Sequence, residues 1–141
     1  MYDVGRMMYL LPVKTMTYIL YHTPYIFKNV YDNKTFRSVT NTSNGEVSNE
    51  TLFQYHQQDK VVWADYAGGG ILKGFLIGVV LEGGLLDMRY EHVNTQGELM
   101  TGRCSSTPEN LPDGRIRLYE QWQWTSGDES SGSSIVEEVI L

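Results

Sequence analysis

A run of alternating side chains between Asp113 and Thr125 constrains the fold more than any other part of the sequence. It opens with Asp113-Gly114, a dipeptide typical of tight turns between strands. Every second residue after it belongs to a set that is apolar except for one carboxylate: Ile116, Leu118, Glu120, Trp122 and Trp124. Because successive side chains of a strand point to opposite faces, this run predicts a β-strand with one buried and one polar face.

Further segments of similar length alternate with turn signals along the rest of the chain. The expected strands cover residues 35–41, 51–57, 60–66, 71–80, 85–93, 98–106, 115–125 and 135–140. We predict a two-residue hairpin turn at Asn44-Gly45, and loops over residues 108–114 and 126–133. About eight short strands without a helical pattern predict an all-β fold. We favour an antiparallel up-and-down barrel of the lipocalin or streptavidin type, with a Greek-key β-sandwich as the alternative.

The chain of 141 residues is long enough for one domain. We assign residues 31–141 to a single β-barrel domain and residues 1–30 to an N-terminal extension, because the extension is rich in Met and Tyr and poor in acidic residues. The extension is open to three interpretations: a disordered or loosely attached tail, an upstream addition to the domain, or an element that docks on the barrel through its tyrosines.

Composition argues against several classes of partner. The formal net charge is −6 and the 11 basic residues are scattered, so we expect no nucleic-acid partner. No apolar stretch approaches the roughly 20 residues of a membrane helix, and no secretory signal is evident. A single cysteine, Cys104, suits a reducing compartment, so we expect a cytoplasmic protein. The three histidines lack metal-ligand spacing, and we expect neither a metal nor a cofactor.

Three motifs carry a resemblance to a known family over residues 34–139: Ser38-Val39-x-Asn41-x-x-x-Asn44-Gly45-Glu46-Val47, Arg89-Tyr90-x-His92-Val93-Asn94-Thr95-x-Gly97-Glu98, and Leu111-Pro112-Asp113-Gly114-Arg115-Ile116 leading into Trp122-Gln123-Trp124. The chain resembles small bacterial all-β proteins that are often labelled N-acetylglutamate synthase, a label that implies acetyl transfer from acetyl-CoA. Such chemistry needs a glycine-rich turn that opens a helix. Here Gly68–Gly70 precede a predicted strand, so we predict no acetyltransferase activity.

Glu120 shares the predicted inner face with the tryptophans, and a carboxylate inside a barrel must be paired, hydrogen-bonded or neutral. Its candidate partners are Tyr55, Tyr90, His92 and, if the strand parity differs, Arg103. We therefore favour a non-catalytic barrel whose aromatic interior binds a small, partly apolar ligand. The candidate ligand-binding residues are Tyr55, Trp63, Tyr90, His92, Arg103, Glu120, Trp122 and Trp124.

Two other functions stay open at this point. In the first, the protein is a cyclase, isomerase or hydrolase that uses Glu120 and His92 as an acid/base pair. In the second, it is an interaction module that forms a homodimer through a sheet face or its tyrosine-rich N-terminus. A purely structural Glu120, with the tryptophans as core anchors, would need no ligand.

Overall fold

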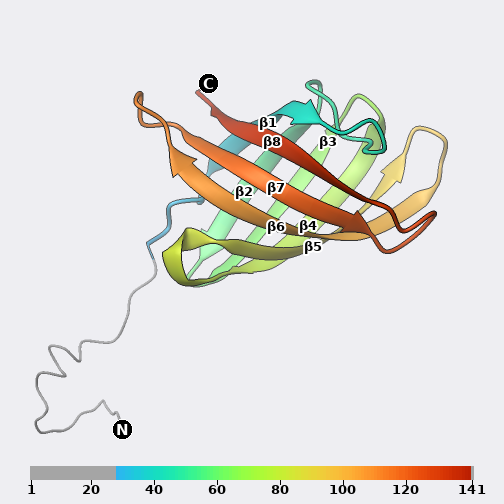
Figure 1. The fold of residues 1–141 in the computed structure, drawn as a ribbon. Helices are drawn as coiled ribbons and strands as arrows, with labels where there is room; N and C mark the ends of the chain where they lie inside the picture. The colour runs from blue at the N-terminus through green and yellow to red at the C-terminus, as the bar shows by residue number, and fades with distance from the viewer. Residues whose placement is uncertain (1–27, 141) are drawn as a thin grey trace, which may run out of the picture.

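The computed structural model describes residues 28–140, which form a closed antiparallel barrel with strand order β1-β2-β3-β4-β5-β6-β7-β8 (Figure 1). The strands are β1 Lys34–Asn41, β2 Leu52–Gln58, β3 Val61–Gly68, β4 Ile71–Val80, β5 Leu86–Asn94, β6 Leu99–Asn110, β7 Ile116–Trp124 and β8 Ser131–Val139. Pairing of β8 with β1 closes the ring and removes both sheet edges. The predicted up-and-down barrel is confirmed, and the sandwich alternative is wrong.

The predicted N-terminal extension lies outside the described residues, apart from 28–30. The 3₁₀ turn Glu82–Gly84 is the one helical element within residues 28–140. Accordingly, this part of the chain holds no helix with the length and apolar character needed to cross a membrane.

Strand β7 follows the predicted alternation. Ile116, Leu118, Trp122 and Trp124 are buried inside the barrel, whereas Tyr119 and Gln121 are exposed on its outer face. The Asp113-Gly114 turn forms as expected, with Gly114 at a φ of 91°, a conformation that favours glycine. The hydrophobic pattern of this strand therefore determines which of its faces is buried.

One end of the barrel is filled by side chains. Tyr31, Phe36 and Leu118 are each 0% exposed there, and the Tyr31 hydroxyl donates a hydrogen bond to the carbonyl of Gly84 at 2.7 Å. Burial raises the pKa of Tyr31 to about 12. Glu138 also points inward at this end, where it accepts hydrogen bonds from the Lys34 ammonium at 3.2 Å and the Ile116 N–H at 3.1 Å. We call this the closed end.

Four inward-facing glycines lie opposite large side chains on the neighbouring strand. The register pairs Gly74 with Tyr66, Gly78 with Met88, Gly102 with Tyr90, and Gly132 with Trp122. A Cβ atom at any of these glycines would collide with the side chain opposite. The side chain opposite therefore occupies the space that each glycine leaves free.

Several predicted boundaries are wrong. Asn44-Gly45 does not form a two-residue hairpin, because β1 ends at Asn41 and β2 begins only at Leu52. Strand β6 continues through Pro108 to Asn110. Its pairing with β5 stops at Ser106, so a proline beyond that point interrupts only one ladder. Strand β8 begins at Ser131, within the predicted flexible loop, because Ser131–Ser134 pair with β7.

Candidate functional site

The end of the barrel opposite Tyr31 contains a cavity of about 60 Å³, enough for a few water molecules or a small chemical group. All eight strands contribute to the walls, β1 through Asn41, and the β1–β2 loop, residues 42–51, reaches over the cavity with Glu46 and Val47. We call this the open end. Its walls include Phe53, Tyr66, Leu76, Met88, Tyr90, His92, Cys104, Glu120, Trp122, Trp124 and Ser134.

Glu120 provides the inner carboxylate of the cavity. The Ser134 hydroxyl donates to Oε1 at 2.8 Å, and the Ser106 hydroxyl donates to Oε2 at 3.3 Å. Desolvation by the surrounding side chains raises the pKa of Glu120 above its ordinary value, and the two serine hydrogen bonds oppose this rise. Each carboxylate oxygen therefore accepts one hydrogen bond from the barrel and retains acceptor capacity.

Aromatic rings form much of the cavity wall. Trp124 packs edge-on against Tyr90, His92 and Trp122, with ring centroids 5.8, 5.7 and 5.6 Å apart. The Trp124 indole N–H donates to the carbonyl of Asn44 at 3.0 Å, so this ring also holds the β1–β2 loop. The rings give the cavity a rigid apolar wall of the kind that suits a flat or compact ligand.

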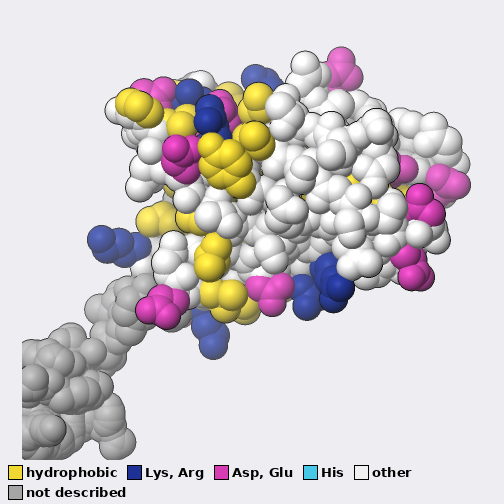
Figure 2. All heavy atoms as spheres, in the orientation of Figure 1, with side chains coloured by type: hydrophobic (Ala, Val, Ile, Leu, Met, Phe, Trp, Pro, Cys, Tyr) yellow, Lys and Arg dark blue, Asp and Glu magenta, His cyan; other side chains and the backbone are white. Residues whose placement is uncertain are grey.

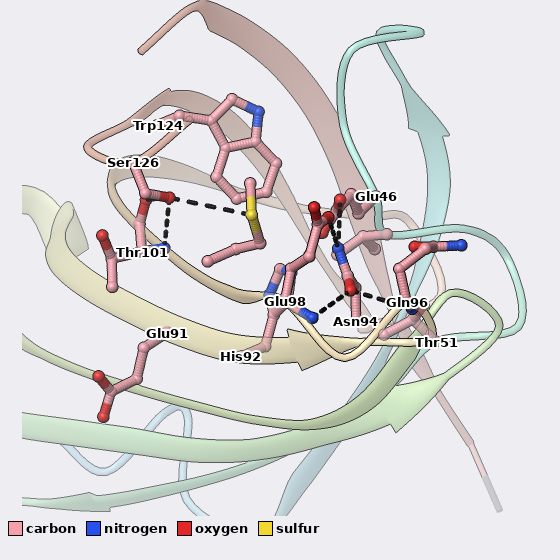
Figure 3. A network of polar contacts seen from close by, with 12 residues as sticks. Glu46, Thr51, Glu91, His92, Asn94, Gln96, Glu98, Thr101, Trp124 and Ser126 are labelled. Atoms are coloured by element: carbon pink, nitrogen blue, oxygen red, sulfur yellow. Dashed lines mark hydrogen bonds and ion pairs between the residues drawn. The ribbon is translucent and has the colours of Figure 1, made fainter. Parts of the chain in front are cut away.

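A polar network joins the β1–β2 loop to the rim of the barrel (Figure 3). His92 Nε2 lies 2.8 Å from Glu46 Oε1, and its Nδ1 lies 2.9 Å from the Tyr66 hydroxyl. The carboxylate can only accept, so Nε2 carries the proton of this hydrogen bond. Asn94 Nδ2 donates to Glu46 Oε2 at 3.0 Å and to Glu98 Oε1 at 2.9 Å. These contacts fasten the loop over the cavity.

Asn41 leaves one acceptor unused at the cavity. Its Nδ2 donates to the carbonyl of Val47 at 2.9 Å, which fixes the orientation of the amide. No donor within residues 28–140 reaches its buried Oδ1 atom. Gly45 packs against this amide so closely that a Cβ atom would collide with it. An unpaired buried acceptor is costly, so Asn41 Oδ1 is a natural point for a ligand donor.

The structure brings together five of the eight predicted site residues: Tyr90, His92, Glu120, Trp122 and Trp124. Tyr55 is inside the barrel but belongs to the filled core, in contact with Phe36 and Met88. Trp63 and Arg103 lie on the outer face, where Trp63 packs on His56 and Arg103 donates to Gln123. Their positions in β3 and β6 have the opposite parity to the inward residues Ala64 and Cys104, so neither reaches the cavity.

Glu120 and His92, the predicted acid/base pair, form no direct hydrogen bond with each other. Both nitrogens of His92 are engaged, one by Tyr66 and the other by Glu46, and Glu120 is held by Ser106 and Ser134. The candidate partners Tyr55, Tyr90, His92 and Arg103 for the Glu120 carboxylate were therefore wrong, because small hydroxyls on the strands beside β7 take that role. Cys104 is buried, and burial raises the pKa of its thiol, so it is a poor nucleophile.

Sequence reasoning missed Asn41, Glu46, Ser106 and Ser134. The two serines could be found only from the strand register, which places Ser106 and Ser134 directly opposite Glu120 on β6 and β8. Asn41 and Glu46 belong to a motif that the resemblance covers, but their role depends on the path of the β1–β2 loop. Within residues 28–140, no three His, Cys, Asp or Glu side chains are grouped so as to hold a metal ion.

Fold and site together define a small closed β-barrel that has a filled core at one end and an aromatic-walled cavity at the other. A family model described as "Avidin-like protein" matches residues 29–139, and the chain belongs to this family. No curated protein and no solved structure matches this chain.

The raised pKa of Glu120 predicts a specific pH dependence of stability. At pH values below the ordinary Glu pKa of about 4.3, the group is protonated in both the folded and the unfolded chain. As pH rises through that value and then through the higher folded-state pKa, the unfolded state releases its proton more readily, and stability falls. We expect the free energy of unfolding of the wild type, minus that of Glu120→Gln, to fall across this pH range and then level off. Urea denaturation of both proteins at each pH provides the measurement. A difference that grows with pH would contradict the assignment.

Proposed function

We propose that this barrel binds one small ligand at its open end, with the head group of the ligand in the cavity beside Glu120. The observation that carries the proposal is a cavity with a rigid aromatic wall and two incompletely used acceptors, Glu120 and Asn41 Oδ1. Apolar walls with a few placed polar groups are typical of small-molecule sites. The volume of about 60 Å³ suits a head group; a larger ligand extends through the mouth or displaces the β1–β2 loop.

Binding accounts for this site better than catalysis. Glu120 and His92 are each hydrogen-bonded to other residues, and burial raises the pKa of the Cys104 thiol, which makes it a poor nucleophile. Gly68 ends strand β3, and Gly69 and Gly70 connect it to strand β4, so these glycines provide no helix N-terminus for the pyrophosphate of acetyl-CoA. The proposal therefore includes neither an acid/base reaction nor acetyl transfer.

Self-association is the second candidate. Leu72, Phe75 and Ile77 on β4 are 58%, 39% and 49% exposed, so the outer face of this strand offers an apolar strip. Such a strip can serve as a contact between copies of the chain.

Native mass spectrometry of the protein purified from its own host tests both candidates at once. We expect one non-covalent adduct per barrel. The adduct should be absent from Cys104→Leu, whose longer side chain enters the cavity, and retained in Ser105→Leu, where the same side chain points to solvent. Biotin, the ligand associated with the avidin-like family, can be added as a defined probe to the wild type and to the two variants. Adducts that are equal in both variants, or absent from all three, would remove the support for a cavity ligand.

A further inference from the structure

The charged groups around the cavity have one sign. Glu120 lies inside the cavity and Glu46 at its rim, and no Lys or Arg is among the described residues that line it. His92 is the one basic side chain, and its Nε2 proton is already donated to Glu46. A ligand that enters the cavity therefore meets two carboxylates without a fixed cation to offset them.

The loops around the mouth of the cavity are also negatively charged. Four loops surround the open end: residues 42–51, 69–70, 95–98 and 125–130. They contain no Lys or Arg and five acidic residues: Glu46, Glu50, Glu98, Asp128 and Glu129. Figure 2 shows Asp and Glu side chains at this end, on the right of the view. The loops of the closed end are mixed, since they include Lys60 and Arg115. The field at the mouth thus attracts cations.

Two acceptors in the cavity have unused hydrogen-bonding capacity. Glu120 has accepted one hydrogen bond at each oxygen, and Asn41 Oδ1 has accepted none within residues 28–140. A carboxylate and an amide oxygen can be satisfied only by donors. A ligand that satisfies both must therefore present N–H or O–H groups.

The aromatic wall suits a positive charge as well as an apolar group. Tyr90, Trp122 and Trp124 all line the cavity, and their ring faces attract cations through the quadrupole of the π system. A bound cation also favours the ionised form of Glu120 and so offsets the desolvation of that carboxylate.

We propose that the ligand head group is a small organic cation with N–H donors, of the amidinium or guanidinium type, that donates to Glu120 and Asn41 Oδ1 against the aromatic wall. This inference rests on the proposed function and specifies the chemistry of its ligand. Charge-assisted hydrogen bonds are stronger than neutral ones, whereas an anion in the same place would be repelled by Glu120 and Glu46.

Three probes of nearly identical shape separate charge from size: acetamidinium, acetamide and acetate. Each is titrated into the uniformly ¹⁵N-labelled full chain while the indole N–H and backbone signals of the cavity are followed by NMR. We expect acetamidinium to bind about tenfold or more tightly than acetamide, and acetate to cause no saturable shift. Binding of acetamidinium should weaken as salt is added, because the rim is exposed and acidic.

Glu120→Gln should lose the preference for acetamidinium over acetamide, whereas Glu82→Gln, the same change in an exposed loop of the closed end, should retain it. The spectrum of each variant reports whether the barrel is intact. If acetamide or acetate binds as well as acetamidinium, the cation inference is wrong but ligand binding in the cavity stands. If none of the three probes shifts the cavity signals, both the inference and the proposed function fail.

Discussion

Replacement of Gly102 by valine is expected to lower the free energy of unfolding by about 3 kcal/mol, at the upper end of the usual cost of overpacking. Gly102 is buried on β6 directly opposite Tyr90, and a Cβ atom at this position would collide with the tyrosine ring. Urea denaturation measures the loss. Valine itself suits a strand, so the penalty comes from the missing space.

Two control variants isolate that cause. Ser105→Val introduces the same side chain on the exposed face of β6, where we expect a change of no more than about 0.5 kcal/mol. In a Tyr90→Ala background, the ring is gone and Gly102→Val should cost at least about 1.5 kcal/mol less than in the wild type. Equal costs in the two backgrounds would show that the ring does not require the glycine.

Truncation of Phe36 to alanine is expected to cost about 3–5 kcal/mol of unfolding free energy, the range for a fully buried phenylalanine. Phe36 is 0% exposed at the closed end and packs edge-on against Tyr55, with ring centroids 4.9 Å apart. The side chains around it leave little room to collapse into the space. Chemical denaturation followed by circular dichroism provides the measurement.

Phe53→Ala is the matched comparison, because the same atoms are removed from a ring that already borders the cavity. We expect a smaller loss, since Phe53 has fewer contacts to forfeit on its cavity side. A cost at Phe53 equal to or above that at Phe36 would contradict the division of the barrel into a filled end and an open end.

Much of the barrel could be predicted from the sequence, because strand patterning is local. The alternation in β7 specified its inner face, and placed Glu120 with Trp122 and Trp124 before any register was known. The predicted site failed where the pattern was ambiguous. Val61–Tyr66 has apolar residues on both parities, so nothing local showed that Ala64, rather than Trp63, faces inward.

Neither the hydrogen-bond partners of Glu120 nor the position of the β1–β2 loop over the cavity could be predicted from local sequence patterns. Nothing in the local sequence distinguishes Ser106 and Ser134 from other polar residues. Only the strand register shows that they lie opposite Glu120. Glu46 reaches His92 across 46 positions of sequence because the β1–β2 loop folds back over the mouth. An Asn-Gly pair in such a loop has the same sequence signature as a tight hairpin, so the signal could not distinguish the two paths.

The three tryptophans lie in two different environments, so the intrinsic fluorescence of the protein has two separate sources. Trp122 and Trp124 are shielded from water and border the cavity, whereas Trp63 lies outside the barrel against His56. Occupancy of the cavity should thus be recorded by blue-shifted fluorescence from the inner pair, while the outer indole supplies an internal reference. The Trp124 indole also donates to the carbonyl of Asn44, so the same inner signal registers when the loop over the mouth lifts.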